Sequence, residues 1–410
     1  MIVCDNASLK MGGESARPVH YFRTLRSRGV EAWLCVHERC RRELTELLGP
    51  DIDRVTFAPD TWKHKLLWRI GKPMPEQFRL TTTGALSQLI TQRWQKRTIQ
   101  SLVPSKKLNV VHQPIPISPK QPSAIDGLGV PVVIGPLNGD INYPPAFGHM
   151  ESSVVRFSVW IGRGLGKLAN TLIPGKRHAR VILVSNERTA NALPDGIEGK
   201  VVRLVANAVD LTTWEVPDRT QRDPAAPPRF CFLGRLVDFK MIDLLLEAFA
   251  PIAKEFAAKL DIIGEGDQRP TLEALAKQLK IDGNVNFAGW MKYKESARLM
   301  AEADAMVFPS LRECGGAVVM EAMAVGLPVI AADWGGPADY VGTDAEGAGM
   351  LIKPDTRESF IAGLTAAMRR LAESPELRRQ MSETARKRAV DQFQWNSRVD
   401  ALLDVYRSVV

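Results

Sequence analysis

Cysteine is scarce in this 410-residue chain, which contains five scattered residues, an odd number: Cys4, Cys35, Cys40, Cys231 and Cys314. This pattern is typical of reduced thiols and excludes a disulfide framework. No apolar run reaches the ~18 residues that a membrane-spanning helix needs. The first ten residues, MIVCDNASLK, contain neither a basic leader nor an apolar stretch. We therefore expect a cytoplasmic protein.

Internal repeats and low-complexity tracts are also absent, and the composition, with 45% hydrophobic and 24% charged residues, is that of a globular protein. At about 100 to 200 residues per domain, the length predicts two domains. No Gly-x-Gly-x-x-Gly follows the first strand of either half, which argues against a dinucleotide-dependent dehydrogenase.

The net charge of +8 is unevenly distributed along the chain. Residues 1–180 contain 26 Lys and Arg against 13 Asp and Glu, whereas the remaining 230 residues contain 28 against 33. The asymmetry favours an anionic partner for the first half, either lipid headgroups or nucleic acid, although a solvated basic surface would have the same composition.

The second half alternates short apolar runs with helical stretches, in the order RFCFLG, DLLLEAFAPIAKEFAA, LDIIG, LEALAKQLK, VNFAG, SARLMAEA, AMVFP, VVMEAMAVG and PVIAAD. This alternation predicts an α/β fold with a doubly wound parallel sheet. The first half shows the same pattern less regularly, and a proline-rich linker separates the halves at about residues 207–228. We expect two Rossmann-like domains, 1–206 and 207–390, and a final helix within 391–410 that returns to the first domain.

Charged residues and glycines occupy the loops at the carboxyl ends of the predicted second-half strands, where ligands bind in such sheets. Arg235 and Lys240 follow the first strand, and two such cations can neutralise a diphosphate leaving group without a metal ion. Gly264 and Gly266 follow the next strand, where glycine permits either close approach of a ligand or a plain turn.

Two carboxylates, Glu313 and Glu321, flank Gly315 and Gly316 at a predicted helix start. Glycines let a ligand approach the backbone, and free amides at a helix start can hold an anion. The carboxylate spacing of up to ~12 Å, at 1.5 Å per residue, suits a ligand with hydroxyls at both ends and phosphates between them, such as a nucleotide-sugar. An ordinary helix with solvated glutamates is the simpler interpretation of the pair alone.

Taken together, GRLVDFKMIDLLLEAF, DIIGEGD, the E-x7-E pair and EAMAVGLPVIAADWGGPADYV resemble GT-B glycosyltransferases of family 4. The resemblance covers residues 200–410 and, more weakly, the first half. It implies a GT-B fold of two Rossmann-like domains facing across a cleft, and a retaining transferase with its donor bound mainly by the second domain. It assigns Arg235 and Lys240 to the donor diphosphate, Glu313 to the donor sugar, Glu321 to the ribose, and Gly12, Gly13, Gly315 and Gly316 to loops around the donor.

The chain departs from the family where many members carry a histidine near the transferred sugar. Here the stretch reads GPLNGDINYPP, and Asn138 is the expected replacement. His112 on the preceding strand is a second candidate, although a histidine at the core edge, satisfied by the backbone, is the simpler interpretation.

Metal sites are not expected. Asp51 and Asp53 follow Gly-Pro in a turn, and Cys35, His37 and Cys40 have no second ligand pair at a usable spacing for zinc.

The function expected from the resemblance is transfer of a sugar from a UDP- or GDP-linked donor to a hydroxyl, with no metal or other cofactor. The acceptor would be a lipid-linked or growing polysaccharide or lipopolysaccharide glycan. Alternatives are a nucleotide-sugar epimerase of the same fold and a non-catalytic membrane- or RNA-binding protein, although RNA-binding signatures are missing. Cations mixed with tryptophans, at 62–72, 93–97 and 156–167, could place the first domain on an anionic bilayer; burial of the tryptophans in the core is the alternative.

Overall fold

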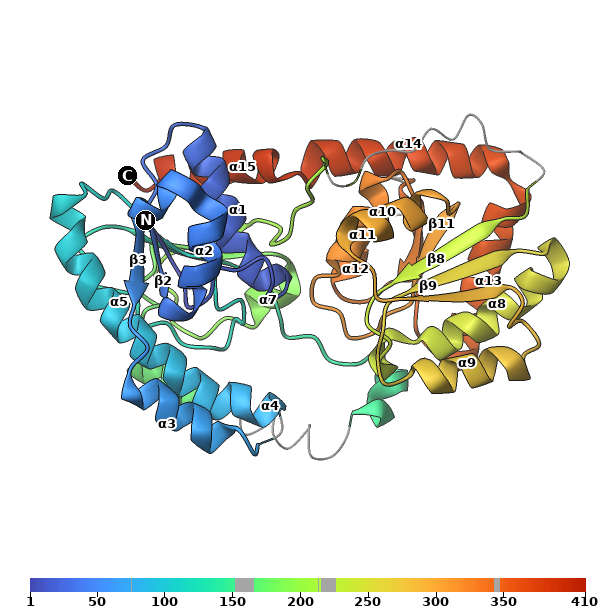
Figure 1. Ribbon diagram of the computed structural model, residues 1–410, viewed down its shortest axis with the longest axis horizontal. Coiled ribbons are helices and arrows are strands. Elements are labelled where there is room, and N and C mark those ends of the chain that lie inside the picture. The colour runs from blue at the N-terminus through green and yellow to red at the C-terminus, as the bar shows by residue number, and fades with distance from the viewer. Residues whose placement is uncertain (75, 152–165, 213, 215–225, 343–346) are drawn as a thin grey trace. The chain divides into compact units, whose positions relative to one another are not determined.

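The computed structural model describes residues 1–74, 76–151, 166–212, 214, 226–342 and 347–410. They form two compact units (Figure 1). The first unit consists of Met1–Asp140, Ser152–Asn207 and Arg398–Val410, and the second of Ile141–Glu151 and Ala208–Ser397.

The first unit is built on a seven-stranded parallel sheet with the order β3-β2-β1-β4-β5-β6-β7. Its strands are β1 (Ile2–Val3), β2 (Leu34–His37), β3 (Val55–Ala58), β4 (Val111–Gln113), β5 (Val132–Leu137), β6 (Val181–Val184) and β7 (Lys200–Arg203). The central strands are buried because helices cover the sheet.

The helices of this unit follow the strands in sequence. They are α1 (Gly13–Ser27), η1 (Glu38–Cys40), α2 (Arg41–Leu48), η2 (Gly49–Arg54), α3 (Trp62–Gly71), α4 (Glu76–Arg79), the π-helical turn η3 (Leu80–Gly84), α5 (Ala85–Ser105) and α7 (Glu187–Asn191). Strands and helices enclose one apolar core in which Val3, Ile99, Val111 and Ile134 are almost completely buried.

The second unit contains a six-stranded parallel sheet with the order β10-β9-β8-β11-β12-β13. Its strands are β8 (Arg229–Leu233), β9 (Lys259–Ile263), β10 (Val285–Gly289), β11 (Ala305–Phe308), β12 (Val329–Ala332) and β13 (Gly349–Ile352). The strand order reverses between β8 and β11, which is where doubly wound sheets bind ligands at their carboxyl edge.

Helices lie on both faces of this second sheet (Figure 1). They are η4 (Pro145–Met150), η5 (Asp238–Lys240), α8 (Ile242–Phe256), α9 (Arg269–Gln278), α10 (Tyr293–Ala301), α11 (Ala317–Ala324), α12 (Gly336–Val341), α13 (Arg357–Glu373) and α14 (Pro375–Gln392). Helix α8 shows why they pack: Ile242, Leu245, Phe249 and Ile252 repeat at helical spacing and are buried against the sheet.

The two doubly wound parallel sheets expected from the sequence are both present. Residues 1–206 do not, however, form one domain as expected, because residues 141–151 pack with the second unit. At the other end, helix α15 (Trp395–Arg407) begins in the second unit, and from Arg398 onward the chain belongs to the first.

Candidate functional site

Two loops meet at the point where the order of the second sheet reverses. One follows β8 and carries Arg235 and Lys240, and the other follows β11 and carries Glu313. Beneath them the rings of Phe232 and Phe308, from β8 and β11, are stacked with centroids 5.8 Å apart. The predicted residues of both loops therefore lie close together above these two stacked, buried rings.

An ion pair joins the two loops. The ammonium group of Lys240 donates to Oε2 of Glu313, and the Lys240 side chain is only 10% exposed. Lys240 Nζ also lies 4.6 Å from the centroid of the Phe308 ring, a favourable position for a cation. A buried lysine paired in this way presents a fixed positive charge at the carboxyl edge of the sheet.

The second oxygen of Glu313 is held as well, because Oε1 accepts a hydrogen bond from the backbone N–H of Gly316 at 3.2 Å. Gly316 has φ 72°, which favours glycine, and it precedes the first turn of α11. The arrangement fixes the carboxylate, while Gly315 remains beside it on the same loop. Arg235, in contrast, is exposed on the β8 loop.

Gly264 and Gly266 have a packing role that the sequence did not reveal. A Cβ atom at Gly264 would lie 1.9 Å from the carbonyl oxygen of Gly234, and one at Gly266 would lie 2.1 Å from that of Leu236. Leu236 N–H also donates to the carbonyl of Glu265. These glycines therefore let the β9 loop support the backbone of the Arg235 loop.

A further pair of glycines supports the Glu313 loop from the other side. Gly336 N–H donates to the carbonyl of Glu313 at 2.8 Å, and a Cβ atom at Gly336 would lie 2.3 Å from the carbonyl oxygen of Cys314. Gly335 and Gly336 lie in the stretch EAMAVGLPVIAADWGGPADYV, which resembles the family pattern. The two adjacent glycines directly after an apolar strand are the sequence feature from which this supporting role could have been predicted.

Glu321 lies farther along α11 and, unlike Glu313, forms no ion pair with any cation in the described part of the chain. Burial raises the pKa of its carboxyl to about 7. Partial desolvation of the hydroxyl raises the pKa of Tyr293 at the start of α10, and the negative charge of Glu321 adds to that effect. Near neutral pH both forms of the carboxyl are therefore populated: an ionised form that only accepts hydrogen bonds and a neutral form that can also donate one.

The predicted residues of the first unit lie at the ends of its strands and at a helix start. Gly12 precedes α1 with φ 89°, and a Cβ atom at Gly12 or Gly13 would meet no other atom within 4 Å. Asn138 directly follows β5, its side chain is buried, and its backbone N–H donates to the carbonyl of Ile117. The open space at the two glycines leaves room for a ligand.

His112 is a structural residue in this unit. Its Nε2 is bonded to the carbonyl of Gly135 at 2.5 Å and its Nδ1 to the hydroxyl of Tyr406 at 2.7 Å. Burial lowers the pKa of the imidazole to about 3, so the ring is neutral. Nδ1 anchors helix α15 and Nε2 is held by β5, so neither nitrogen is available to a substrate.

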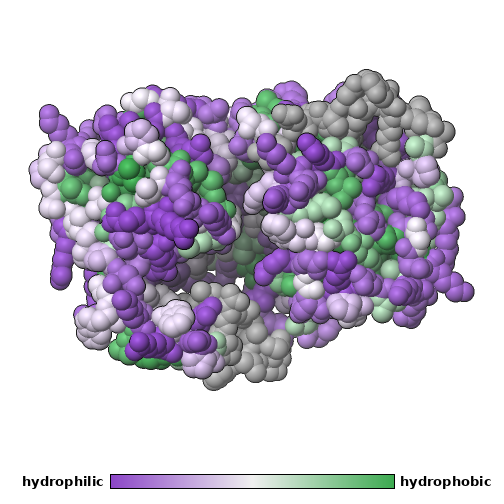
Figure 2. All heavy atoms as spheres, in the orientation of Figure 1, coloured by the Kyte–Doolittle hydropathy of each residue, from purple (hydrophilic) through white to green (hydrophobic). Residues whose placement is uncertain are grey.

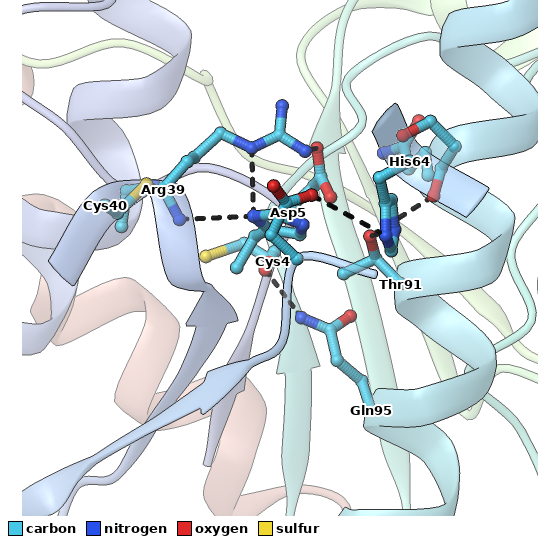
Figure 3. Close-up of polar contacts among 12 residues, drawn as sticks. Cys4, Asp5, Arg39, Cys40, His64, Thr91 and Gln95 are labelled. Atoms are coloured by element: carbon cyan, nitrogen blue, oxygen red, sulfur yellow. Dashed lines mark hydrogen bonds and ion pairs between the residues drawn. The ribbon is translucent and has the colours of Figure 1, made fainter. Parts of the chain in front are cut away.

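A second polar cluster gathers beyond the ends of β1, β2 and β3 (Figure 3). Metal-ligating atoms of His37, Asp60 and His64 lie within 4.8 Å of one another. Nδ1 of His37, however, accepts hydrogen bonds from the backbone and side chain of Arg39, and Nδ1 of His64 accepts one from the backbone N–H of Thr61.

These hydrogen bonds place the proton of each neutral ring on Nε2, so neither ring offers a metal ion a free lone pair. Burial, with Arg39 nearby, lowers the pKa of His37 to about 4 and keeps that ring neutral. The residues therefore do not fit a metal site unless these hydrogen bonds break.

Helix α3 carries much of the basic, tryptophan-containing surface expected from the sequence. Its exposed apolar side chains Trp62, Leu66 and Ile70 recur every fourth residue, while His64 and Gly71 face the core. Figure 2 shows apolar and strongly hydrophilic surface side by side in this region. None of the helices within the described residues has the length and apolarity that crossing a membrane requires.

Several other residues expected on that surface have partners within the first unit. Trp94 packs on the core of the first unit, and Lys96 pairs with Asp126 at 2.5 Å. Lys167 pairs with Asp195. Residues 156–163 lie outside the described residues.

Comparison with known proteins identifies the fold. Residues 218–388 match the family model of glycosyl transferases group 1. The chain is 32% identical over 238 residues to a D-inositol 3-phosphate glycosyltransferase of Saccharomonospora viridis, covering 54% of this chain and 52% of that protein. It is 29% identical over 208 residues to the lipopolysaccharide core biosynthesis glycosyltransferase LpsE of Rhizobium meliloti, covering 50% and 58%. The matched part spans about half the length of these curated relatives.

Among solved structures, Anabaena Alr3699/HepE in complex with UDP has a TM-score of 0.64 at 16% identity, with 99% of each chain covered. At this identity the likeness shows the fold alone, and it extends over both units. The expected resemblance to GT-B glycosyltransferases and the GT-B fold are confirmed, whereas membership of family 4 and retention of configuration stay predictions.

Proposed function

We propose that this chain is a retaining glycosyltransferase. It has the GT-B fold, and its residues 218–388 match the family model of glycosyl transferases group 1. It moves a sugar from a nucleoside diphosphate sugar to a hydroxyl of a lipid-linked or growing glycan. UDP is the preferred donor nucleotide, because a protein of the same fold binds it. A glycan acceptor is supported by the similarity to a lipopolysaccharide core enzyme.

The Lys240–Glu313 ion pair at the sheet's reversal point carries this proposal. Breaking the bond between sugar and diphosphate leaves negative charge on the phosphate oxygens. The fixed ammonium of Lys240 and the exposed guanidinium of Arg235 stabilise that charge, which lowers the barrier without a metal ion. Glu313 accepts hydrogen bonds from the sugar hydroxyls, and Glu321 accepts those of the ribose.

The acceptor hydroxyl attacks the sugar on the face that the diphosphate leaves, and a phosphate oxygen takes the hydroxyl proton. The bond from sugar to phosphate breaks as the bond from sugar to acceptor forms, so configuration is retained. Polar groups at the ends of the first unit's strands, with Asn138 the foremost candidate, hold the acceptor.

Nucleotide binding gives the first test. In a thermal-shift screen of UDP, GDP, ADP and their sugar conjugates, we expect UDP and its conjugates to raise the Tm, because a ligand that binds only the folded state stabilises it. Lys240→Ala and Glu321→Ala should abolish the shift. The proposal is wrong if no nucleotide raises the Tm of the wild-type protein.

We also propose that α3 rests on an anionic membrane and brings the enzyme to a lipid-linked acceptor. The stripe of Trp62, Leu66 and Ile70 is flanked on the helix by cations, which is the pattern of interfacial helices. The flanking cations are Lys63, Lys65, Arg69 and Lys72. Each cation near such a surface contributes about 1 kcal/mol.

Vesicle co-sedimentation tests this surface. We expect binding to vesicles that contain phosphatidylglycerol, weakened by salt, and little binding to pure phosphatidylcholine. Trp62→Ser combined with Leu66→Ser should weaken binding about tenfold or more. Val201→Ser, which changes an exposed apolar residue elsewhere on the same unit, should leave it unchanged. Equal binding of both variants would refute the assignment of α3.

A further inference from the structure

Residues 141–151, which we name the hook, leave the first unit and pack with the second. The chain enters the hook directly from the β5 loop that carries Asn138. The hook includes the short helix η4 and is anchored by Phe147, which is 3% exposed and packs edge-on against Phe360 of α13. This apolar contact holds the hook independently of its polar contacts.

The hook's first residues contact the loop after β12. Trp334 Nε1–H donates to the carbonyl of Asn142 at 2.9 Å. Ile141 packs directly on the backbone of Gly335, where a Cβ atom would lie 2.5 Å from its Cδ1. The neighbouring Gly336 N–H holds the carbonyl of Glu313. The hook therefore supports the backbone that in turn supports Glu313.

A second set of contacts reaches the residue immediately before Glu313. The Arg312 guanidinium lies 5.6 Å from the centroid of the Tyr143 ring and 4.0 Å from Oε1 of Glu151. The positive charge of Arg312 also acts on the Tyr143 hydroxyl and partly offsets the rise in its pKa that burial causes. Both hook residues are largely buried, so these contacts constrain the Arg312 side chain.

The same tyrosine lies close to the other half of the ion pair. Burial raises the pKa of Tyr143, and the carboxylate of Asp238 adds to that effect. Asp238 opens η5, the turn that ends at Lys240. The hook thus contacts the segment next to Glu313 and lies within electrostatic range of the turn that ends at Lys240, although it comes from the half of the sequence that forms the other unit.

We propose that the hook sets the position of the Glu313 loop, with Tyr143 and Trp334 as positioning residues that act through Arg312 and Gly336. The proposal rests on the proposed function, because Glu313 is there the group that binds the donor sugar. The hook then determines how well the site holds the sugar. The nucleotide is held mainly by Arg235 and Glu321, which take no part in the hook contacts described above.

Two conservative variants isolate the polar contacts. Tyr143→Phe removes only the hydroxyl and keeps the ring beside Arg312. Trp334→Phe removes the N–H donor together with part of the indole ring and keeps an aromatic side chain. Since one hydrogen bond contributes about 1 kcal/mol, the double variant should weaken binding of UDP-glucose, or of whichever conjugate the screen identifies, by about 5- to 20-fold. Binding of the free nucleotide should change less than twofold.

Amide hydrogen exchange supplies a readout that requires no ligand. In the double variant, exchange at Gly316 and Gly336, whose N–H groups donate to Glu313, should become at least several-fold faster. Exchange in α8 should stay unchanged. Phe147→Leu, which loosens the anchor alone, should produce the same local pattern.

The outcomes separate the two proposals. If the wild-type protein binds no nucleotide, the proposed function fails, and hydrogen exchange still decides whether the hook positions the loop. Unchanged exchange at Gly316 and Gly336 in the double variant would overturn the inference. So would equal weakening of nucleotide and nucleotide-sugar binding, because that is the result of a general structural defect.

Discussion

Replacing Lys240 with methionine should lower the rate of sugar transfer by about a hundredfold to a thousandfold, the usual loss when one fixed donor to a developing negative charge is removed. Methionine nearly matches the length of lysine, and it can pack on the Phe308 ring that lies beneath the ammonium. The variant should therefore fold and differ from the wild type mainly in charge.

Lys240→Arg and Glu313→Gln separate the roles of the two partners. Lys240→Arg keeps the charge and should retain more activity than Lys240→Met, although the planar guanidinium does not reproduce the lysine geometry. Glu313→Gln keeps an acceptor for Gly316 N–H and should weaken sugar binding more than nucleotide binding. Turnover is measured on the donor that the screen identifies, with the Tm as a check on folding. Turnover of Lys240→Met within threefold of the wild type would exclude Lys240 from the chemistry.

Much of the candidate site could be predicted because its residues follow recognisable strands. Arg235 and Lys240 come directly after the apolar run RFCFLG, and Glu313 comes after AMVFP. In a parallel doubly wound sheet the carboxyl ends of neighbouring strands share one edge, so local patterns were enough to bring these loops together. The ion pair between Lys240 and Glu313 follows from that adjacency.

The hook could not be predicted in the same way, because nothing in INYPPAFGHM states which unit its aromatic residues join. Tyr143 and Phe147 are apolar residues in a loop, and any nearby core would accept them. Their partners Arg312 and Phe360 lie more than 150 positions away. The need for glycine at position 266 could not be predicted either. It arises because the backbone of a different loop, at Leu236, lies too close for a Cβ atom.

The role of His112 was undecided in the sequence for a related reason. A histidine at the end of a strand can face a ligand or bond to the backbone, and its neighbours in sequence do not distinguish the two. The deciding partner, Tyr406, is contributed by the last helix, 294 residues later. Tyr406 also links the C-terminal segment to the first unit. The sequence predicted a final helix that returns to the first domain, but not this contact.

Glu321 should make donor affinity depend on pH. Its carboxyl has a pKa of about 7 because burial disfavours the charge. Ribose hydroxyls donate hydrogen bonds, so they favour the ionised form, which accepts at both oxygens. Only about 1% of the carboxyl is ionised at pH 5 but most of it is at pH 8. Donor affinity should therefore rise by up to about a hundredfold over that range and level off above pH 8.

Glu321→Gln provides the matched control because glutamine has the same shape and does not titrate. Its donor affinity should be nearly flat between pH 5 and 8, and any titration of the nucleotide itself would appear equally in both proteins. Isothermal calorimetry with the sugar conjugate measures both curves. Parallel pH profiles of the two proteins would show that this carboxyl does not control binding.

The stability of the ligand-free protein should change in the opposite direction. A carboxyl whose pKa is higher in the folded state than its ordinary 4.5 favours folding while it is protonated in both states. That contribution is lost between pH 4.5 and 7 as the unfolded chain ionises first, by on the order of 3 kcal/mol. The Tm of Glu321→Gln should accordingly exceed that of the wild type at pH 8 and approach it at pH 5. A saturating donor should reduce this difference in Tm between the two proteins at pH 8. The ribose hydroxyls then donate hydrogen bonds to the ionised Glu321 carboxylate, a stabilising effect that is weaker for the uncharged glutamine.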